Sequence, residues 1–444
     1  MNTPDDKLSV ADKRARMKDI MSRAREVGGV VMQEFTPQTL NPAFYDFAQD
    51  PAILGLAAQH AALADRKLEN PFFKSNDGIA RGTTQIAGGV YINYANYNYL
   101  GLSGELSVSN AAITAIRDMG TSVSASRISS GERAVQRNLE TALAGVYDVE
   151  DAVVFVSGHA TSVTTIGHLF GPRDLILYDE LAHNSAIQGA ILSGARRIAF
   201  PHNDSAALET LLAANRGQHD RVLIFIEGVY SMDGDVPDLP CFIALRNRYK
   251  TYLMVDEAHA LGALGARGFG IRELFGIKGN EVDIWMGTLS KTLASCGGYI
   301  AGSHALVEYL KYSAPGFLFS VGITPPNAAA SLAAIELMQA EPHRVTTLRA
   351  RGDLFRELAK AEGLDIGLSE QSPVVPVIVK DSMLAVALSN ALFAKGINVQ
   401  PVLYPAVEED QSRLRFFLSS AHTEDQIRMT VETISTELLM LRGP

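Results

Sequence analysis

RVLIFIEGVYSMDGDVPDLPCFIALRNRYKTYLMVDEAH, residues 221–259, sets the fold class of this chain. Two short apolar runs that favour β-structure, VLIFIEG and TYLMVDEA, enclose a segment with helical spacing, LPCFIALRNRYK. A strand, a helix and a second strand in this order form the repeating unit of a parallel sheet that is covered by helices. The stretch therefore predicts an α/β architecture.

The same alternation extends from about residue 98 to residue 330. Further β-rich runs in this region are DAVVFVSG, DLILYD, RRIAFPH, DIWMGT and GGYIAG, and SAALETLLAAN is another connecting segment with helical spacing. We therefore predict a mostly parallel sheet with helices on its faces. Beyond the long helix predicted in TPPNAAASLAAIELMQ, we expect a smaller α+β domain. Its strands are predicted in SPVVPVIVK and RLRFFLSS, and its helices in SMLAVALSNALFAK and TEDQIRMTVETISTELLML.

We predict three parts of the chain: residues 1–88 as a helical extension with a hairpin, residues 89–328 as the large domain, and residues 329–444 as the small domain. In the first part, DPAILGLAAQHAALADRK predicts a helix, and TTQIAGGVYINYA predicts a β-hairpin because its central glycines separate two β-prone runs. A short charged helix is expected near residues 10–24. It either packs on the body or a partner subunit, or docks a carrier protein.

Composition excludes several classes of protein. The 444 residues are 47% hydrophobic and 20% charged, as in globular enzymes, and a net charge of −10 gives no basic field for nucleic acid or an anionic membrane. We find no apolar run long enough to span a bilayer, no signal-peptide core at the charged start, and no His/Cys spacing for a metal. Two cysteines suit a reducing compartment, so we expect a cytoplasmic protein.

Polar residues stand where five of the predicted strands end. They are Ser157, Gly158 and His159, then His183, then Ser231 and Asp233, then Asp256 and His259, and finally Thr288, Ser290 and Lys291. Ligands of open α/β sheets bind outside the carboxyl ends of the strands. We therefore expect these side chains to converge on one crevice.

Lys291 is the most informative member of this set. A lysine amine can form a Schiff base with an aldehyde cofactor, and pyridoxal phosphate is the common case. The phosphate of that cofactor requires hydroxyls and free backbone N–H groups, ideally at the start of a helix. Thr288 and Ser290 flank the lysine, and SGHATS at 157–162 offers a second amide-rich turn.

The ring of the same cofactor has three further needs. Its pyridine nitrogen requires a carboxylate at a strand end, and Asp256 fits. His183 could contact the ring, and His259 or Ser231 could serve its phenolic oxygen. Each residue also has a structural interpretation: Asp256 could cap a helix, His183 could be a satisfied structural histidine, Ser231 could shape a turn, and Lys291 could be solvated.

At this point the sequence resembles the α-oxoamine synthases, pyridoxal-phosphate enzymes of the fold-type-I aminotransferase superfamily. The resemblance runs from about residue 90 to the end. The matching motifs are NYNYLGL (96–102), GVYSMDGD (228–235), VDEAHALGALG (255–265), GTLSK (287–291) and RLRFFLSSAHT (413–423). The resemblance implies a large domain with a seven-stranded, mostly parallel sheet and a smaller C-terminal α+β domain.

The resemblance also implies roles for individual residues. Lys291 would bind pyridoxal phosphate, Asp256 would pair with its pyridinium nitrogen, and His183 would stack on its ring. The remaining contacts, to the phenolic oxygen and the phosphate, are assigned to His259, Ser231, Gly158, His159, Thr288 and Ser290.

Three further assignments concern substrates and the partner subunit. Ser320 resembles a phosphate contact supplied by the second subunit, which implies a homodimer with shared active sites. Arg413 would hold the carboxylate of the amino acid, and Asn98 in NYNYLGL is a further candidate for substrate binding. The implied reaction is the decarboxylating condensation of a small amino acid with an acyl thioester to give an α-amino ketone.

The sequence departs from the family pattern at several positions, and we expect a contact to the acyl substrate or to the neighbouring subunit to differ. SGERAVQ has Glu132 and Gln136 where the family usually has Thr and His, and His159 replaces a usual Phe or Tyr. TSVSASRISSGER resembles a branch associated with secondary metabolism, in which an acyl carrier protein often tethers the donor. The donor thioester could therefore be carried by coenzyme A or by a carrier protein.

Two other functions remain open from the sequence. An aminotransferase or an amino-acid lyase on the same fold would share the cofactor residues, although NYNYLGL and RLRFFLSSAHT favour a condensing enzyme. A non-catalytic scaffold subunit of a synthase would lack the lysine, so Lys291 argues against that interpretation. Glycine, alanine and serine all suit a small substrate pocket.

Overall fold

The structure is a computed structural model that describes residues 11–12, 14–15, 17–19 and 40–443. The chain divides into two compact units, Met1–Lys67 and Leu68–Pro444. In the first unit, helix α2 (Pro51–Asp65) confirms the helix predicted there, and the side chain of Asp50 caps it by accepting a hydrogen bond from the Ala52 N–H. The charged helix predicted near residues 10–24 lies largely outside the described residues.

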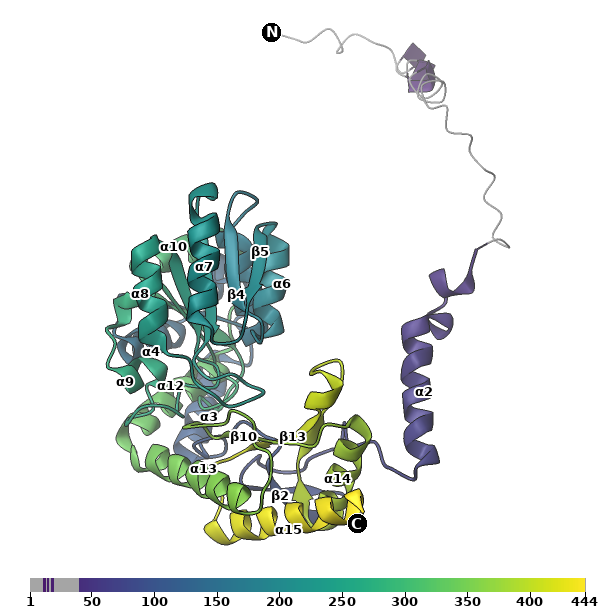
Figure 1. Cartoon of the computed structure of the whole chain (residues 1–444). Coiled ribbons are helices and arrows are strands. Elements are labelled where there is room, and N and C mark those ends of the chain that lie inside the picture. Colours follow the sequence, from purple (N-terminus) through teal and green to yellow (C-terminus); the bar gives the residue numbers. More distant parts are fainter. Residues whose placement is uncertain (1–10, 13, 16, 20–39, 444) are drawn as a thin grey trace. The chain divides into compact units, whose positions relative to one another are not determined.

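The second unit is built on a seven-stranded sheet with the order β3-β9-β8-β7-β6-β4-β5. Its neighbouring strands β4 and β5 are labelled in Figure 1. Only β9 runs antiparallel to its two neighbours, and the other four neighbouring pairs are parallel. The strands are β3 (Asp151–Phe155), β4 (Leu175–Asp179), β5 (Arg196–Phe200), β6 (Val222–Glu227), β7 (Tyr252–Asp256), β8 (Ile284–Thr288) and β9 (Gly298–Gly302). The predicted α/β fold with a mostly parallel sheet is confirmed.

Both faces of this sheet are buried. Successive side chains of a strand point to opposite sides, so each face contributes to a different apolar cluster. Ile224 of β6 belongs to one apolar cluster, and its neighbours Leu223 and Phe225 belong to the other. The helices that contribute to the first cluster include α3 (Leu106–Met119), α4 (Ala134–Tyr147), α7 (Ser205–Asn215), α8 (Leu239–Tyr249), α9 (Gly270–Phe275) and α12 (Pro325–Ala340). Those of the second are α5 (Gly158–Leu169), α6 (Asn184–Ser193), α10 (His304–Ser313) and α11 (Pro315–Leu318).

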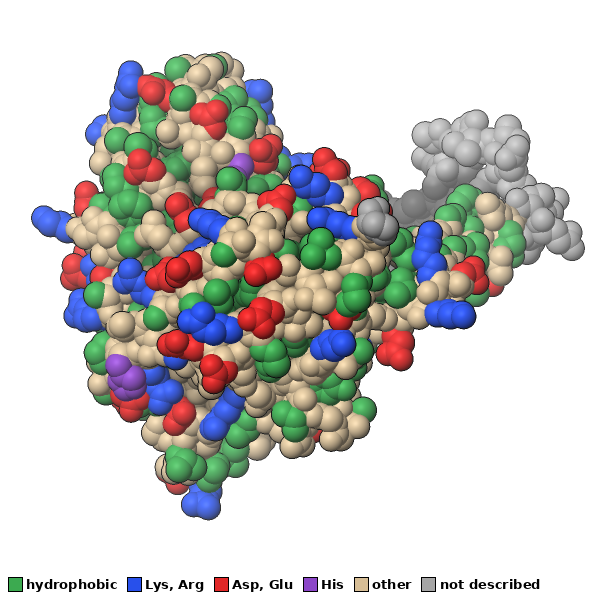
Figure 2. All heavy atoms as spheres, turned by 60° about the horizontal axis from the view of Figure 1, so that its bottom comes forward, with side chains coloured by type: hydrophobic (Ala, Val, Ile, Leu, Met, Phe, Trp, Pro, Cys, Tyr) green, Lys and Arg blue, Asp and Glu red, His purple; other side chains and the backbone are tan. Residues whose placement is uncertain are grey.

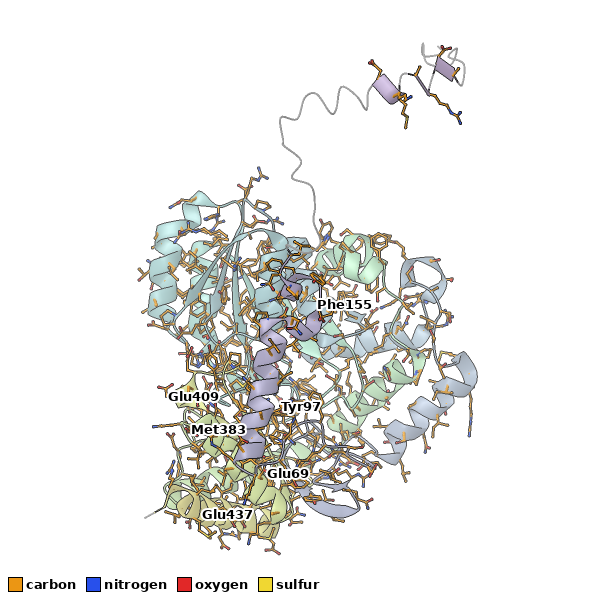
Figure 3. The ribbon with its side chains drawn as sticks, turned by 90° about the vertical axis from the view of Figure 1, so that its right-hand side faces the viewer. Glu69, Tyr97, Phe155, Met383, Glu409 and Glu437 are labelled. Atoms are coloured by element: carbon orange, nitrogen blue, oxygen red, sulfur yellow. The ribbon has the colours of Figure 1, made fainter. Side chains whose placement is uncertain are left out.

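Two small sheets complete the unit. The predicted hairpin forms β1 (Thr83–Ile86) and β2 (Gly89–Asn93), and β11 (Ile397–Asn398) pairs with β2. The other sheet has the order β10-β13-β12, with β10 (Val374–Ile378), β12 (Gln400–Val402) and β13 (Arg413–Phe417) antiparallel. Helices α13 (His343–Ala361), α14 (Ser382–Ala394) and α15 (Glu424–Arg442) pack nearby, and Met383 of α14 and Glu437 of α15 are labelled in Figure 3.

The hairpin and the C-terminal part thus share a sheet, and the predicted boundary at residue 88 falls within the hairpin turn. The division of the chain into three domains stays a prediction. Basic and acidic side chains are interspersed on the face shown in Figure 2, without a large patch of one sign. Within the described residues, no helix has the length and apolar character needed to cross a bilayer.

Candidate active site

A cavity of about 240 Å³ lies at the carboxyl edge of the large sheet. It is lined by the last residues of β6, β7 and β8 and by the first residues of α5. Eight of the predicted site residues line it: Gly158, His159, His183, Asp256, His259, Thr288, Ser290 and Lys291. Four of the five strand-end groups therefore converge as expected, whereas Ser231 and Asp233, which follow β6, do not line the cavity.

One side of the cavity has the chemistry of an anion cradle. Helix α5 begins at Gly158, so the free N–H groups of its first turn face this end of the cavity. A Cβ at Gly158 would lie 2.8 Å from Thr288 Oγ1, so only glycine permits this close approach. The hydroxyls of Thr288 and Ser290 lie 2.7 Å apart. Amides and hydroxyls in this arrangement fit a phosphate group.

Lys291 reaches into the cavity beside these groups. Its side chain forms part of the cavity wall. Burial lowers the pKa of its amine to about 8, although the charges of Asp256 and Glu227 favour the protonated form. The Nζ atom lies 5.6 Å from the centroid of the Tyr97 ring. A substantial fraction of this amine is therefore neutral, and nucleophilic, near neutral pH.

Two buried carboxyl groups, those of Asp256 and Glu227, line the cavity together with the lysine. Burial raises the pKa of Asp256, and the charge of Lys291 opposes that rise. One oxygen of Asp256 accepts a hydrogen bond from the Ala258 N–H at 2.9 Å, so Asp256 also fixes the turn after β7. Glu227 was not predicted. Burial and the charge of Asp256 raise its pKa well above the ordinary value, and it accepts a hydrogen bond from the His183 N–H at 2.6 Å.

Burial favours the neutral form of two histidines that line the cavity, His183 and His259. Burial lowers the pKa of His183, whose Nδ1 lies 2.8 Å from the Ser185 hydroxyl. Burial also lowers the pKa of His259 well below its ordinary value, and its Nδ1 lies 2.7 Å from the Tyr99 hydroxyl. The rings of His159 and His183 are 6.4 Å apart and nearly perpendicular. Neutral rings suit stacking and hydrogen bonding more than charge pairing.

Three predicted residues do not line this cavity. The carbonyl of Ser231 accepts a hydrogen bond from Arg415. The side chain of Asn98 donates to the Ala80 carbonyl and accepts from the Ser103 N–H, so it holds its own loop together. Ser320 donates a hydrogen bond to the adjacent carbonyl of Val321 at 3.3 Å. Their predicted roles toward a cofactor or substrate stay predictions.

Arg413 also lies outside the cavity lining, and its guanidinium is already engaged. It donates hydrogen bonds to Asp233 and to the carbonyls of Met232 and Gln411. Arg415, two residues further along β13, has a buried Nε with no hydrogen-bond partner among the described residues. The positive charge of Arg415 contributes to lowering the pKa of Lys291, so the guanidinium acts on the amine in the cavity through its charge.

The Aminotransferase class I and II family profile matches residues 90–434 of this chain. The 8-amino-7-oxononanoate synthase of Fervidobacterium nodosum is 38% identical over 344 residues, which cover 77% of this chain and 87% of that protein. The enzyme of the same name from Thermosipho melanesiensis is 38% identical over 347 residues, 78% of this chain and 88% of that one. The chain belongs to the α-oxoamine synthase family.

Solved structures agree with this membership. A serine palmitoyltransferase with pyridoxal phosphate superposes with a TM-score of 0.82 at 26% identity and covers 86% of this chain and 96% of its own. The 8-amino-7-oxononanoate synthase of Francisella tularensis gives a TM-score of 0.68 at 27% identity, with 78% and 97% covered. The predicted family, fold and dependence on pyridoxal phosphate are confirmed.

Two of the departures from the α-oxoamine synthase pattern have structural partners. Glu132 accepts hydrogen bonds from Arg127, whose guanidinium also contacts the buried Glu140. Gln136 donates a hydrogen bond to the Ile323 carbonyl at 2.8 Å. Because Ile323 closely follows Ser320, Gln136 tethers the segment that carries the predicted contact to the second subunit.

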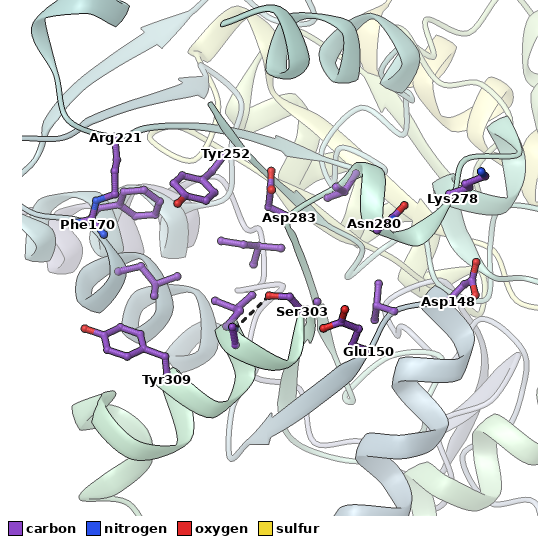
Figure 4. A pocket seen from close by; sticks show the side chains of 17 residues that line it. Asp148, Glu150, Phe170, Arg221, Tyr252, Lys278, Asn280, Asp283, Ser303 and Tyr309 are labelled. Carbon is purple, nitrogen blue, oxygen red and sulfur yellow. Dashed lines mark hydrogen bonds between the residues drawn. The ribbon is translucent and has the colours of Figure 1, made fainter. Parts of the chain in front are cut away.

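A larger hollow of about 740 Å³ lies at the amino edge of the same sheet (Figure 4). Phe170, Tyr252 and Tyr309 line it together with the charged side chains of Arg221 and Asp283. None of the predicted site residues lines it. Because the strand carboxyl ends carry the lysine, the carboxylate and the anion cradle, the smaller cavity is the candidate active site.

Proposed function

We propose that this α-oxoamine synthase condenses a small amino acid with an acyl thioester and releases carbon dioxide and a free thiol. The product is an α-amino ketone. The observation that carries the proposal is the convergence of Lys291, Asp256 and the anion cradle in one cavity of a chain with this family membership. These three features match the aldehyde, the pyridine nitrogen and the phosphate of pyridoxal phosphate.

When bound, pyridoxal phosphate supplies an electron sink for negative charge that forms at the α-carbon of the amino acid. The residues of the cavity would hold it as follows. Lys291 would bind the aldehyde carbon through its amine, Asp256 would keep a proton on the pyridine nitrogen, and Thr288 and Ser290 with the first amides of α5 would bind the phosphate. His183 contacts the ring.

Lys291 then serves as general base. Its Nζ would take the proton from the α-carbon of the amino acid, the new carbon–carbon bond would form at the thioester carbonyl as the thiol leaves, and the carboxylate would be lost as carbon dioxide. A pKa of about 8 places the amine close to the operating pH, which is the condition for efficient proton transfer in both directions.

An arginine is required to hold the carboxylate that is later lost as carbon dioxide. Arg413 is one candidate, but Asp233 and two carbonyls occupy its guanidinium. Arg415 has an unpartnered Nε and a charge that Lys291 senses, so its geometry is the better match for a bidentate carboxylate contact.

The proposed assembly is a homodimer in which Ser320 serves the active site of the partner. The position of Ser320, which does not line the cavity of its own chain, supports this assembly. Mixing inactive Lys291→Ala protein with Ser320→Ala protein tests it, because subunit exchange would create sites that carry both wild-type residues. A cytoplasmic location is likewise a proposal and rests on the two free cysteines.

The decisive experiment offers glycine, alanine or serine together with coenzyme A thioesters of increasing acyl length. We expect carbon dioxide and free thiol to appear in equal amounts, and the wild-type protein to be yellow with bound cofactor. Production of a keto acid without thiol release would instead identify an aminotransferase. A colourless protein that gains no colour with pyridoxal phosphate would exclude both functions and leave the scaffold interpretation.

A further inference from the structure

The hollow at the amino edge of the large sheet has no role in the reaction described above (Figure 4). Its volume of about 740 Å³ is in the range of small-molecule sites, about 300–1,000 Å³. No described residue lines both this hollow and the cavity that contains Lys291. Binding in the hollow is therefore a separate event from binding at the active site.

The hollow is long and narrow. Its lining includes Glu150, just before β3, and Arg221, just before β6. Three strands, β9, β8 and β7, stand between β3 and β6, so the two ends lie about 19 Å apart at about 4.8 Å per strand spacing. Val282, Ile284 and Leu306 line the middle with apolar side chains. A volume spread over this length suits an extended chain more than a compact molecule.

Aromatic side chains form one end of the hollow. The rings of Phe170 and Tyr252 pack edge to face at 6.1 Å. Tyr252 and Tyr309 are 43% and 52% exposed. Arg221 lies at the same end and is paired with Asp174 at 2.7 Å. This end therefore offers accessible aromatic surface, and its guanidinium is already neutralised.

Two turns form the other end, which is polar. The turn between α4 and β3 carries Asp148 and Glu150, and the turn before β8 carries Lys278 and Asn280. All four residues are exposed. The turns are packed tightly, since a Cβ at Gly279 would overlap the carbonyl oxygen of Asp148. Carboxylate acceptors and N–H donors are therefore held side by side.

The unpaired charges at the polar end are mostly negative. Among the described residues, no basic side chain forms an ion pair with Asp148 or Glu150, and no acidic side chain forms one with Lys278. Asp283, by contrast, accepts a hydrogen bond from Arg246 at 2.9 Å. Two free carboxylates thus face one free ammonium, a balance that favours a cationic ligand.

We propose that this hollow binds an α-amino ketone with a long acyl chain, the class of product that the proposed function yields, and the inference rests on that function. The ammonium of such a molecule matches Asp148 and Glu150. Its adjacent carbonyl matches the side-chain amide of Asn280, and its chain matches the apolar middle and the aromatic end. A fatty-acid anion of the same length carries the opposite charge and does not match.

Direct binding tests the hollow independently of turnover. The probe is 1-(dimethylamino)dodecan-2-one, whose tertiary nitrogen cannot form a Schiff base with the cofactor, titrated by calorimetry into the full-length holoenzyme. Ala305→Trp fills the hollow from an exposed position on α10 and should raise Kd about tenfold or more, because the chain loses apolar contact surface. Asp148→Asn and Glu150→Gln each remove one charge and should raise Kd about threefold, the effect of one exposed ion contact. Glu357→Gln, which removes an exposed carboxylate of α13, is the matched control and should leave Kd unchanged.

Three results would overturn the proposal: no saturable binding to the wild type, an equal Kd for Ala305→Trp and the wild type, or dodecanoate that binds as tightly as the probe. A second ligand, N,N-dimethyldodecylamine, lacks the carbonyl. Asn280→Ala should therefore weaken binding of the ketone and leave binding of this amine unchanged, and an equal effect on both ligands would contradict the proposal.

The same protein separates this inference from the proposed function. Wild-type protein that binds the probe in the hollow but condenses no amino acid with a thioester would contradict the proposed function alone. Protein that carries out the condensation but does not bind the probe would contradict this inference alone.

Discussion

Reductive methylation of Lys291 in the cofactor-free protein should report the buried amine directly, because only a neutral amine attacks formaldehyde before cyanoborohydride reduces the adduct. Burial lowers the pKa of Lys291 from the ordinary 10.5 to about 8. At pH 7 about one-tenth of such an amine is neutral, roughly 300-fold more than for an ordinary lysine. The rate should therefore rise about tenfold per pH unit up to about pH 8 and level off above it.

The assay is mass spectrometry of the peptide that contains residue 291, with the exposed Lys360 of α13 measured in the same digest as the reference. A second arm uses Asp256→Asn. The Asp256 charge raises the pKa of Lys291, so its removal should move the midpoint to lower pH. A Lys291 rate that climbs in parallel with Lys360 to about pH 10, or a midpoint that Asp256→Asn moves upward, would refute this electrostatic account.

Three other variants test the surroundings of the site. Burial lowers the pKa of His202, but its carboxylate partners Asp179 and Asp235 outweigh burial and raise this pKa to about 10. The contribution of His202 to the free energy of unfolding is therefore complete below the unfolded pKa of 6.5 and is lost as the pH rises toward 10. His202→Gln should therefore lower urea-unfolding stability at pH 6 and matter less at pH 10; an equal loss at both would contradict the ion pairing. Glu227→Gln should preserve stability because the raised pKa of Glu227 favours a neutral carboxyl, whereas Glu227→Ala should cost about 1–3 kcal/mol by leaving the His183 N–H without its acceptor. Arg415→Lys should raise the KM for the amino acid about tenfold or more, and Arg413→Lys should change thermal stability more than KM; the reverse pattern would favour Arg413 as the carboxylate ligand.

The sequence predicted the large sheet and most of the cavity for one physical reason. Buried parallel strands read as short apolar runs, and the polar residue that ends each run lies at the carboxyl edge, where ligands bind. Asp256, Thr288 and Lys291 were found in this way, and so were the first residues of α5. Periodicity and strand ends are local properties, so a single sequence displays them.

Glu227 was missed because it is the last residue of the apolar run VLIFIE and resembles the end of a strand more than a site residue. Its importance depends on burial beside Asp256 and on a contact with the His183 backbone, which lies 44 residues away in the chain. An acidic residue that closes a fully buried strand is the one signal that could have found it, since such a group is costly unless paired or protonated.

The choice between Arg413 and Arg415 could not be made from the strand pattern, because residues two apart project from the same face of a strand. The hydrogen-bond partners of the two arginines in the GVYSMDGD segment (228–235) differ. Asp233 of this segment binds Arg413, and the carbonyl of Ser231 accepts from Arg415 while leaving its Nε open. His202 in turn holds the same segment through Asp235. One segment after β6 therefore pairs with Arg413 and leaves the Nε of Arg415 open. With Arg415 as the proposed carboxylate ligand, a loss of His202 should act on amino-acid binding through this segment and raise KM before it lowers kcat.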